Sequence, residues 1–357
     1  MENIFTLLKD EKELHEQFVL LNNCELFDPA KNLISQIASE MSDEDGNFVE
    51  QFQTQGFEAR LWELFLNNFF LENDFEVVPM ERPDFKIKKN DIEIFVEAST
   101  SNPTDGDKYS KEFIQESIDK KDIDMQNELV DYYVIKLGSV LYSKVNKKYW
   151  EIEDVKDKPL ILAITPCHNY LSKFLPDSKI IEYLYGIRWV VAKNEDGSAS
   201  ISSEKIDTHT HEVDGKVKEI PSCFFEQENV ENISAVLFSN NCDLHKFNRM
   251  GFEAGLSEKE LIMVRSGLCF NETPEILEPK KFTYNIEKGQ NKENWKEGVS
   301  IMHNPNAKVK LDTNLFTDMR QIWINEKGGL EQIMPEFYPY NSLTISGQMV
   351  ENTEKTQ

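Results

Sequence analysis

The chain has 357 residues, of which 39% are hydrophobic and 11% aromatic, a composition that excludes disordered and collagenous proteins and predicts a packed core. No run approaches the roughly 18 apolar residues of a membrane span, and the first residues lack the features of a signal peptide, so we expect a cytoplasmic protein with no membrane partner. The 64 acids and 39 bases give a net charge of −25, which repels polyanions, so any phosphate binding must be local.

The cysteines are odd in number and widely separated, which fits reduced thiols better than a disulfide framework. No Cys-x-x-Cys pair is present to begin a zinc site. The five cysteines are Cys24, Cys167, Cys223, Cys242 and Cys269.

Residues 1–47 have the spacing of short helices and end in a polar turn, so they predict an N-terminal helical segment. Phe57 to Asn73 has apolar residues along one face and predicts an amphipathic helix. The elements expected next are three short strands, a long helix, a buried strand, a short helix and a second buried strand. They cover Phe75–Pro79, Asp84–Lys88, Ile92–Ala98, Met125–Tyr149, Pro159–Thr165, Ile180–Tyr185 and Ile233–Ser239.

This order predicts an α/β fold with a mixed central sheet flanked by helices. We expect the main domain over residues 48–270, with a polar insertion near 190–230. Residues 271–350 predict a small C-terminal extension, and residues 351–357 a disordered tail.

Asn90 and Asp91 both tolerate the left-handed conformation that a two-residue hairpin turn needs. Pairing the flanking strands through this turn sets Asp84 directly opposite Glu97. The same register sorts the hairpin into two faces. Phe85, Ile87, Ile92, Ile94 and Val96 fall on an expected core face, and Asp84, Lys86, Lys88, Glu93 and Glu97 fall on an expected wet face, together with the apolar Phe95.

Two carboxylates directly opposite each other repel unless a positive charge lies between them. A divalent cation would supply that charge, and Mg²⁺ or Mn²⁺ held by Asp84 and Glu97 could activate water for phosphodiester hydrolysis. The alternative is a pair of surface acids that are neutralised by Arg82, Lys86 or Lys88.

These residues resemble the motif of the PD-(D/E)XK nuclease superfamily. Pro83-Asp84 is followed by Glu97-Ala98-Ser99 at the end of an apolar strand, and the order of elements matches that superfamily's restriction-endonuclease core over roughly residues 55–165. The resemblance implies that Asp84 and Glu97 are metal ligands, that the Ala98 carbonyl is a further ligand, and that Glu63 on the first helix is an additional acid.

The lysine that the superfamily places two residues after the second acid is here Ser99. Lys144 is the first candidate to replace it, because the long helix should pack beside the strand pair. Lys86 and Arg82 are the others. If none reaches the metal, the domain could bind nucleic acid without cleaving it.

Glu58 competes with Glu63 for the role on the first helix. Glu63 is preferred because it follows the small Ala59 by four residues, where a helix can approach a sheet. Both acids could instead be solvated residues of an amphipathic helix.

Several lysines and one arginine could contact nucleic-acid phosphates. The lysines of the long helix could equally be solvated residues on an exposed helix face, with no ligand. For the two cations beyond the second buried strand, the alternative is a loop that closes the domain. The candidate phosphate contacts are Lys136, Lys147, Lys148, Lys246 and Arg249.

Two weaker patterns are an expected incidental pair, His209 and His211, and the adjacent Cys167 and His168. Neighbouring residues on a strand point to opposite faces, which argues against Cys167 acting as a thiol nucleophile with His168 as its base.

The leading interpretation is a metal-dependent endonuclease that acts on DNA, with Asp84, Glu97, Glu63 and Lys144 in its active site. Family analogy implies a role in prokaryotic antiviral defence. The net charge of −25 is compatible with a nuclease that stays idle until an activating protein partner or a homo-oligomer presents the substrate. The alternative is a catalytically inactive PD-(D/E)XK-like module that binds protein or nucleic acid, which the charge of −25 favours.

Overall fold

The computed structural model describes residues 1, 3–43, 46–78, 80–103, 109, 114–116, 119–120, 123–193, 199–213, 216–273, 278–290 and 292–348. The chain forms two compact units. Unit 1 contains Met1–Phe75, Asn241–Gly298 and the segment from Pro335, and unit 2 contains Glu76–Asn240 and Val299–Met334. This division differs from the consecutive segments expected from the sequence, because the expected boundaries after residues 47 and 270 both fall inside unit 1. The expected tail, residues 351–357, lies outside the described residues.

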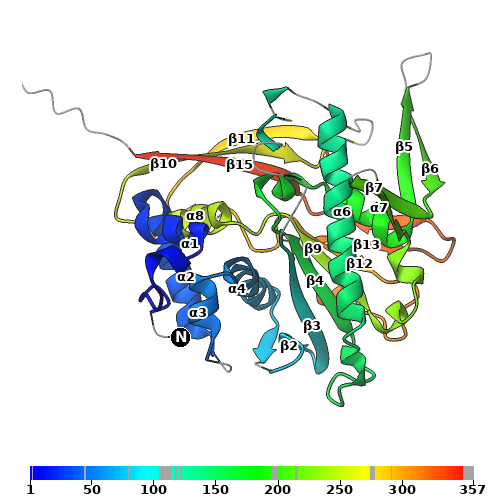
Figure 1. The fold of residues 1–357 in the computed structure, drawn as a ribbon, viewed down its shortest axis with the longest axis horizontal. Helices are drawn as coiled ribbons and strands as arrows, with labels where there is room; N and C mark the ends of the chain where they lie inside the picture. Colours follow the sequence, from blue (N-terminus) through cyan, green and yellow to red (C-terminus); the bar gives the residue numbers. More distant parts are fainter. Residues whose placement is uncertain are drawn as a thin grey trace, which may run out of the picture. The chain divides into compact units, whose positions relative to one another are not determined.

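Unit 2 is built on an eight-stranded mixed sheet, which confirms the expected α/β class (Figure 1). β3, β4 and β9 run parallel to one another, whereas β2 runs antiparallel to β3 and β12 antiparallel to β9. In spatial order the strands are β1 (Glu76–Val78), β2 (Phe85–Lys89), β3 (Ile92–Ser101), β4 (Leu160–Pro166), β9 (Ala235–Ser239), β12 (Val299–His303), β13 (Arg320–Ile324) and β14 (Leu330–Ile333).

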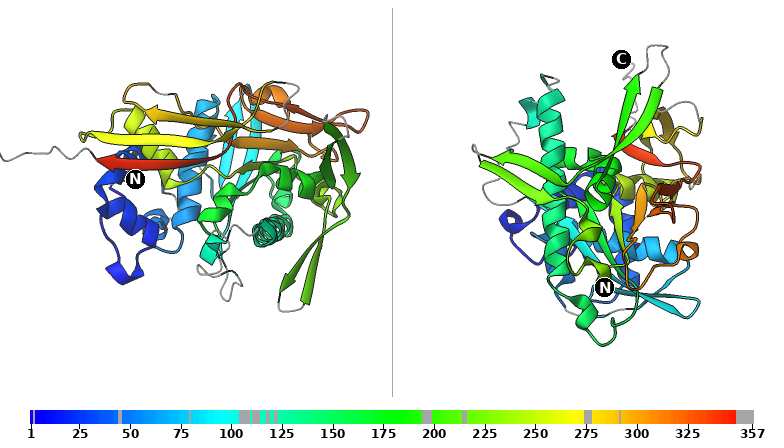
Figure 2. Two further views of the ribbon diagram at one scale, coloured as in Figure 1. Left: turned by 90° about the horizontal axis from the view of Figure 1, so that it is seen from above. Right: turned by 90° about the vertical axis from the view of Figure 1, so that its right-hand side faces the viewer.

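Helix α6 (Ile123–Val145) connects β3 to β4 and covers one face of the sheet. Figure 2 shows α6 end-on to one side of the strands. Leu137 and Leu141 of the helix are buried with Phe95 of β3 and Leu162 of β4 in one hydrophobic core. Every residue of β4 and β9 is buried, as expected for apolar runs at the centre of a sheet. Helix α7 (Asp177–Tyr185) follows β4 and packs into the same core.

The hairpin of β2 and β3 has the register expected from the sequence. Phe85 pairs with Val96, and Ile87 pairs with Ile94. Asn90 and Asp91 form the turn with φ values of 51° and 62°, which asparagine and aspartate tolerate better than most residues.

The expectation that one face of this hairpin is exposed to solvent is wrong at the end away from the turn. Phe95 is fully buried and Glu97 is only 4% exposed. The reason is that α6 packs over this face, so β3 is covered on the side where the sequence predicted solvent. Phe85, Ile87, Ile94 and Val96 are buried as expected, whereas Ile92 beside the turn is exposed.

The polar insertion forms two hairpins that belong to neither larger sheet (Figure 2). Their strands are β5 (Ile187–Lys193) with β6 (Ala199–Lys205), and β7 (Thr208–Val213) with β8 (Lys216–Pro221). Short 3₁₀ helices complete the chain at η1 (Glu11–Glu13), η2 (Glu25–Phe27), η3 (Tyr149–Glu151), η4 (Tyr170–Phe174), η5 (Phe224–Glu226), η6 (Val230–Asn232) and η7 (Thr313–Leu315).

Unit 1 combines helices with a three-stranded antiparallel sheet, ordered β11-β10-β15. Gly251 lets α8 approach α2 closely, because a Cβ at this position would lie 2.2 Å from the Pro29 carbonyl oxygen. In the part of the chain that the structure describes, no helix is long and apolar enough to cross a bilayer. The elements of unit 1 are α1 (Glu16–Asn23), α2 (Asp28–Glu40), α3 (Phe48–Gln53), α4 (Phe57–Glu72), α8 (Leu244–Glu253), β10 (Leu261–Cys269), β11 (Lys280–Ile286) and β15 (Pro339–Gln348).

Candidate active site

The centre of the candidate site is an ion pair between helix α6 and strand β3. Lys144 Nζ lies 2.5 Å from Glu97 Oε1. Lys144 is in the last turn of α6, and Glu97 is in the middle of the neighbouring strand. Lys144 thus lies beside the strand pair, as its place on the expected long helix predicts. Glu97 is therefore a buried acid with a cation already beside it.

Asp84 lies directly before β2, where the observed register continued by one residue sets it opposite Glu97. Its side chain is exposed, and Asp84 Oδ2 accepts a hydrogen bond of 2.7 Å from the Ala98 amide. This bond fixes the carboxylate against the strand that carries Glu97. The structure thus brings together Asp84, Glu97 and Lys144 within unit 2.

Tyr149 is a member of this site that the sequence analysis missed. It begins η3, directly after the turn that ends α6, where Lys148 has a φ of 52°. Burial raises the pKa of the Tyr149 hydroxyl well above its ordinary value, and its hydrogen bond to Glu97 and the charges of Glu97 and Asp84 raise it further. The phenol therefore stays protonated and donates to Glu97. Its only signal in the sequence is its place as the last residue of the expected long helix.

Ser99 occupies the position of the superfamily's lysine on β3. It is buried on the same face as Glu97, and its hydroxyl has no hydrogen-bond partner among the described residues. The side chain is too short to replace a lysine. The only cation within hydrogen-bond distance of Glu97 in the described chain comes instead from α6.

The other two cations proposed for this role are placed differently. Lys86 Nζ lies 2.8 Å from Glu93 Oε1, toward the turn end of the hairpin. Arg82 is exposed. Its positive charge opposes, but does not cancel, the rise in the pKa of Tyr149. Lys144 is therefore the best placed of the three.

Glu63 belongs to α4 in unit 1, whereas Asp84 and Glu97 belong to unit 2. Within its own unit, Glu63 Oε2 accepts a hydrogen bond of 2.6 Å from Arg60 Nη1. The competing Glu58 lies 3.4 Å from His15 Nε2 and accepts a hydrogen bond from Gln17. The role of Glu63 as an additional acid stays a prediction.

The lysines at the end of α6 have the exposure that a phosphate contact needs. Lys147 and Lys148 are exposed just beyond the helix, and Lys148 Nζ lies 3.6 Å from Glu151. Lys136 is half-buried, with its ammonium over the ring of Tyr132.

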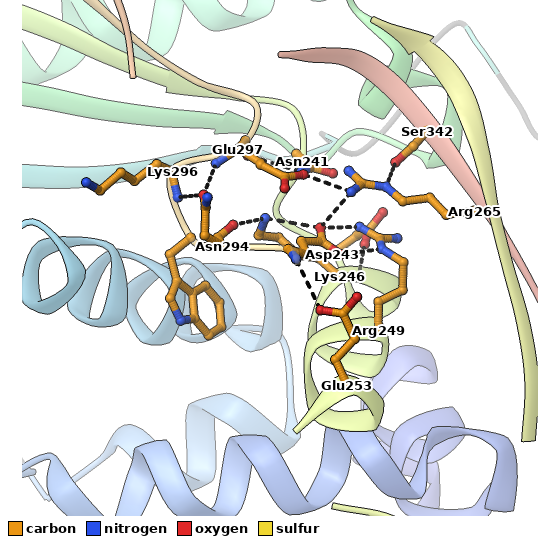
Figure 3. Close-up of polar contacts among 12 residues, drawn as sticks. Asn241, Asp243, Lys246, Arg249, Glu253, Arg265, Asn294, Lys296, Glu297 and Ser342 are labelled. Carbon is orange, nitrogen blue, oxygen red and sulfur yellow. Dashed lines mark hydrogen bonds and ion pairs between the residues drawn. The ribbon is translucent and has the colours of Figure 1, made fainter. Parts of the chain in front are cut away.

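The predicted phosphate contacts by Lys246 and Arg249 are wrong. These side chains are 0% and 1% exposed on α8, inside a buried charged cluster of unit 1 (Figure 3). Lys246 Nζ lies 3.2 Å from Glu293 Oε1 and Arg249 Nε lies 2.6 Å from Glu293 Oε2. Because both cations are buried and paired, they stabilise unit 1 and have no surface to offer a nucleic acid.

Arg265 of β10 completes this cluster from the neighbouring sheet. Its Nη1 lies 2.8 Å from Glu297 Oε2 and 3.5 Å from Glu293 Oε1. Burial alone would raise the pKa of Glu293, but the charges of Arg249, Arg265 and Lys246 hold it well below its ordinary value. The cluster therefore holds α8, β10 and the chain around Glu293 together.

In the part of the two weaker patterns that the structure describes, the side chains have other partners. His209 is buried and its Nδ1 lies 2.5 Å from Ser222 Oγ, and nothing is described for the side chain of His211. His168 Nδ1 lies 2.9 Å from the Ser101 carbonyl oxygen, and Cys167 Sγ lies 3.4 Å from Lys173 Nζ. Cys167 and His168 thus have different partners, as expected for adjacent residues.

Among the residues that the structure describes, no three His, Cys, Asp or Glu side chains gather as a metal site. Asp84 and Glu97 supply two carboxylates, the number that Mg²⁺ commonly takes from a protein while it keeps several waters. The donor chemistry therefore fits this cation. Comparison of the chain with protein-family models, with curated proteins and with solved structures finds no match in any of the three. Function is accordingly inferred from the geometry of the site.

Proposed function

We propose that this chain is a Mg²⁺- or Mn²⁺-dependent nuclease that hydrolyses phosphodiester bonds at Asp84, Glu97 and Lys144. The observation that carries the proposal is the contact of 2.5 Å between Lys144 and Glu97, with Asp84 directly before the facing strand. Two acids that can hold a cation, beside an ammonium that can stabilise phosphate charge, are the groups that this hydrolysis needs.

The order of elements supports a PD-(D/E)XK-like core. The chain runs through α4, β1, β2, β3, α6 and β4, and β3 pairs in parallel with β4 after the α6 crossover. Asp84 precedes β2 and Glu97 lies in β3, as the motif requires. In this interpretation Lys144 of the crossover helix replaces the strand lysine that is Ser99 here.

Each residue of the site has a distinct role in the proposed reaction. Asp84 and Glu97 would hold the metal ion, with the Ala98 carbonyl as a further ligand. When bound, this ion supplies a water of lowered pKa and polarises the phosphate. Lys144 stabilises the negative charge that develops on the phosphate oxygens. Tyr149 donates a hydrogen bond to Glu97 and so fixes the orientation of that carboxylate.

DNA is the proposed substrate, and defence against foreign DNA in a prokaryote is the proposed setting. A net charge of −25 makes the chain as a whole repel DNA. We therefore include in the proposal a second copy of the chain or an activating protein that presents the substrate to the site.

The second candidate function is a catalytically inactive module that binds protein or nucleic acid. The specific observation in its favour is that Lys144 already neutralises Glu97, which leaves Asp84 as the one acid of the pair that is exposed. In that case the ion pair would fasten α6 to β3 and would not serve catalysis.

Calorimetry with Mn²⁺ separates the two functions. We expect wild type and Asp91→Asn to bind the ion equally and Asp84→Asn to lose binding. Asp91 is the matched control because it is an exposed acid of the same hairpin, in a turn conformation that asparagine also adopts. Equal binding by wild type and Asp84→Asn, or no binding by wild type, would favour the inactive module.

A further inference from the structure

Three lysines surround one glutamate at the turn end of the β2–β3 hairpin. Lys86 Nζ lies 2.8 Å and Lys88 Nζ 3.3 Å from Glu93 Oε1, and Lys158 forms a short ion pair with Glu93 Oε2. Lys86 and Lys88 come from β2, and Lys158 from the segment just before β4. We name these four residues the lysine cluster.

The charges of the lysine cluster do not balance. Three ammonium groups face one carboxylate, so these four residues together carry a charge of +2, with Glu76 of β1 opposite Lys88 in the strand register. One lysine would suffice to neutralise Glu93, and the additional cations repel one another. Hydrogen bonds from Lys158 and Lys86, with a further one from Lys88, lower the pKa of Glu93 to about 2, so at neutral pH the acid is ionised and offsets one of the three positive charges.

The cluster is also accessible. The side chains of Lys88 and Lys158 are 37% and 35% exposed. The ammonium groups of Lys86 and Lys158 also lie 5.6 and 5.5 Å from the centre of the Phe95 ring. Contacts with an aromatic ring and with Glu93 keep these long side chains ordered in one place, which lowers the entropic cost of binding an anion there.

The position of the cluster relates it to the candidate active site. Glu93, Phe95 and Glu97 lie on the same face of β3, with Phe95 between the two acids. Four residues of extended strand separate Glu93 from Glu97 by ~13 Å.

We propose that Lys86, Lys88 and Lys158 form a binding site for the backbone phosphates of a nucleic acid at the turn end of the β2–β3 hairpin. Glu93 occupies the site as an internal anion, and a backbone phosphate takes over its contacts with the lysines. This inference rests on the proposed function for the identity of the ligand. It adds a local positive site on a chain whose overall charge repels DNA.

The test is equilibrium binding of a fluorescein-labelled DNA duplex, measured without divalent ions at several NaCl concentrations in the Asp84→Asn background, so that cleavage does not interfere. Lys88→Ala and Lys158→Ala should each weaken binding several-fold and reduce the slope of log K against log salt by about 0.9. Glu93→Gln should strengthen binding, because it removes the internal competitor. Lys308→Ala is the control, since it removes an exposed, ion-paired lysine elsewhere in unit 2 and should leave binding unchanged.

The outcome is independent of whether the chain cleaves DNA. Failure of wild type to cleave would contradict the proposed function but not this site, because the site is judged by binding alone. Lys88→Ala and Lys158→Ala variants that bind like Lys308→Ala would overturn the inference. So would Glu93→Gln binding no more tightly while retaining the unfolding midpoint of wild type. Binding of inorganic phosphate by wild type without binding of the duplex would assign the lysines to a free anion, and would also overturn the proposal.

Discussion

Lys144 and Glu97 are 47 positions apart in the chain, yet their charged groups lie 2.5 Å apart across the interface of α6 and β3. The crossover from β3 through α6 to β4 explains this proximity, because it returns the end of the helix to the strand that precedes it. A cation on this helix can therefore reach the carboxylate of Glu97.

Replacing Lys144 should lower turnover strongly. In Lys144→Met, the transition state would lose a positive charge near the phosphate, with an expected rate loss of roughly 10² to 10³. Metal affinity should change little. Single-turnover cleavage at saturating metal measures this effect, and Lys308→Met is the control, because it removes an exposed, ion-paired lysine elsewhere in unit 2. A Lys144→Met rate within twofold of wild type would remove this lysine from the proposed mechanism.

Tyr149→Phe should reduce the activity without unfolding the protein. The variant keeps the buried ring and loses the hydrogen bond to Glu97, a bond to a charged group that contributes about 1.5–3 kcal/mol. We expect a rate loss of about tenfold or more, because Glu97 loses part of its orientation. Tyr142→Phe is the control, since Tyr142 is 50% exposed on α6. Equal rates for the two variants would contradict a positioning role for Tyr149.

The buried charged cluster of unit 1 predicts a large stability effect at one residue. Glu293→Gln would leave Lys246, Arg249 and Arg265 without their shared acid, and breaking a buried ion pair in this way costs about 3–5 kcal/mol. Chemical denaturation should show unit 1 unfolding at a much lower urea concentration. Glu287→Gln, at an exposed position, should unfold like wild type. A midpoint for Glu293→Gln equal to that control would refute the structural role of the cluster.

His209 predicts a loss of stability in mild acid. Burial lowers the pKa of His209 in the folded protein, although nearby Glu182 and Asp131 oppose the shift and Arg188 and Lys179 add to it. The unfolded chain then binds more protons, so stability is full above pH ~6.5 and falls as the pH drops below that value, by at most about 1.4 kcal/mol per pH unit.

Urea unfolding of wild type and His209→Gln at pH 7.5 and 5.5 measures this dependence. We expect a smaller acid-induced loss in His209→Gln, whereas the exposed His245→Gln should behave like wild type. Identical losses in all three proteins would exclude His209 as the source.

Parts of the site that depend on local rules were predictable from the sequence. The Asn90–Asp91 turn and the alternation of side chains fix the register of the hairpin, and the register sets Asp84 opposite Glu97. The spacing of apolar residues likewise indicated the helix that carries Lys144.

Features that depend on distant segments were not predictable. The burial of Lys246 and Arg249 depends on Glu293, which lies more than 40 residues further along the chain. The burial of Glu97 depends on how α6 covers β3. The composition of unit 1 depends on the return of later segments to the N-terminal helices, which no local pattern encodes.

The most direct test of the account is cleavage of a labelled DNA duplex in the presence and absence of Mg²⁺ or Mn²⁺, with wild type, Asp84→Asn, Glu97→Gln and the control Asp91→Asn. The account predicts divalent-dependent cleavage by wild type and Asp91→Asn, and losses of at least about 10²-fold in Asp84→Asn and Glu97→Gln. Cleavage by Asp84→Asn or Glu97→Gln at the wild-type rate would contradict it.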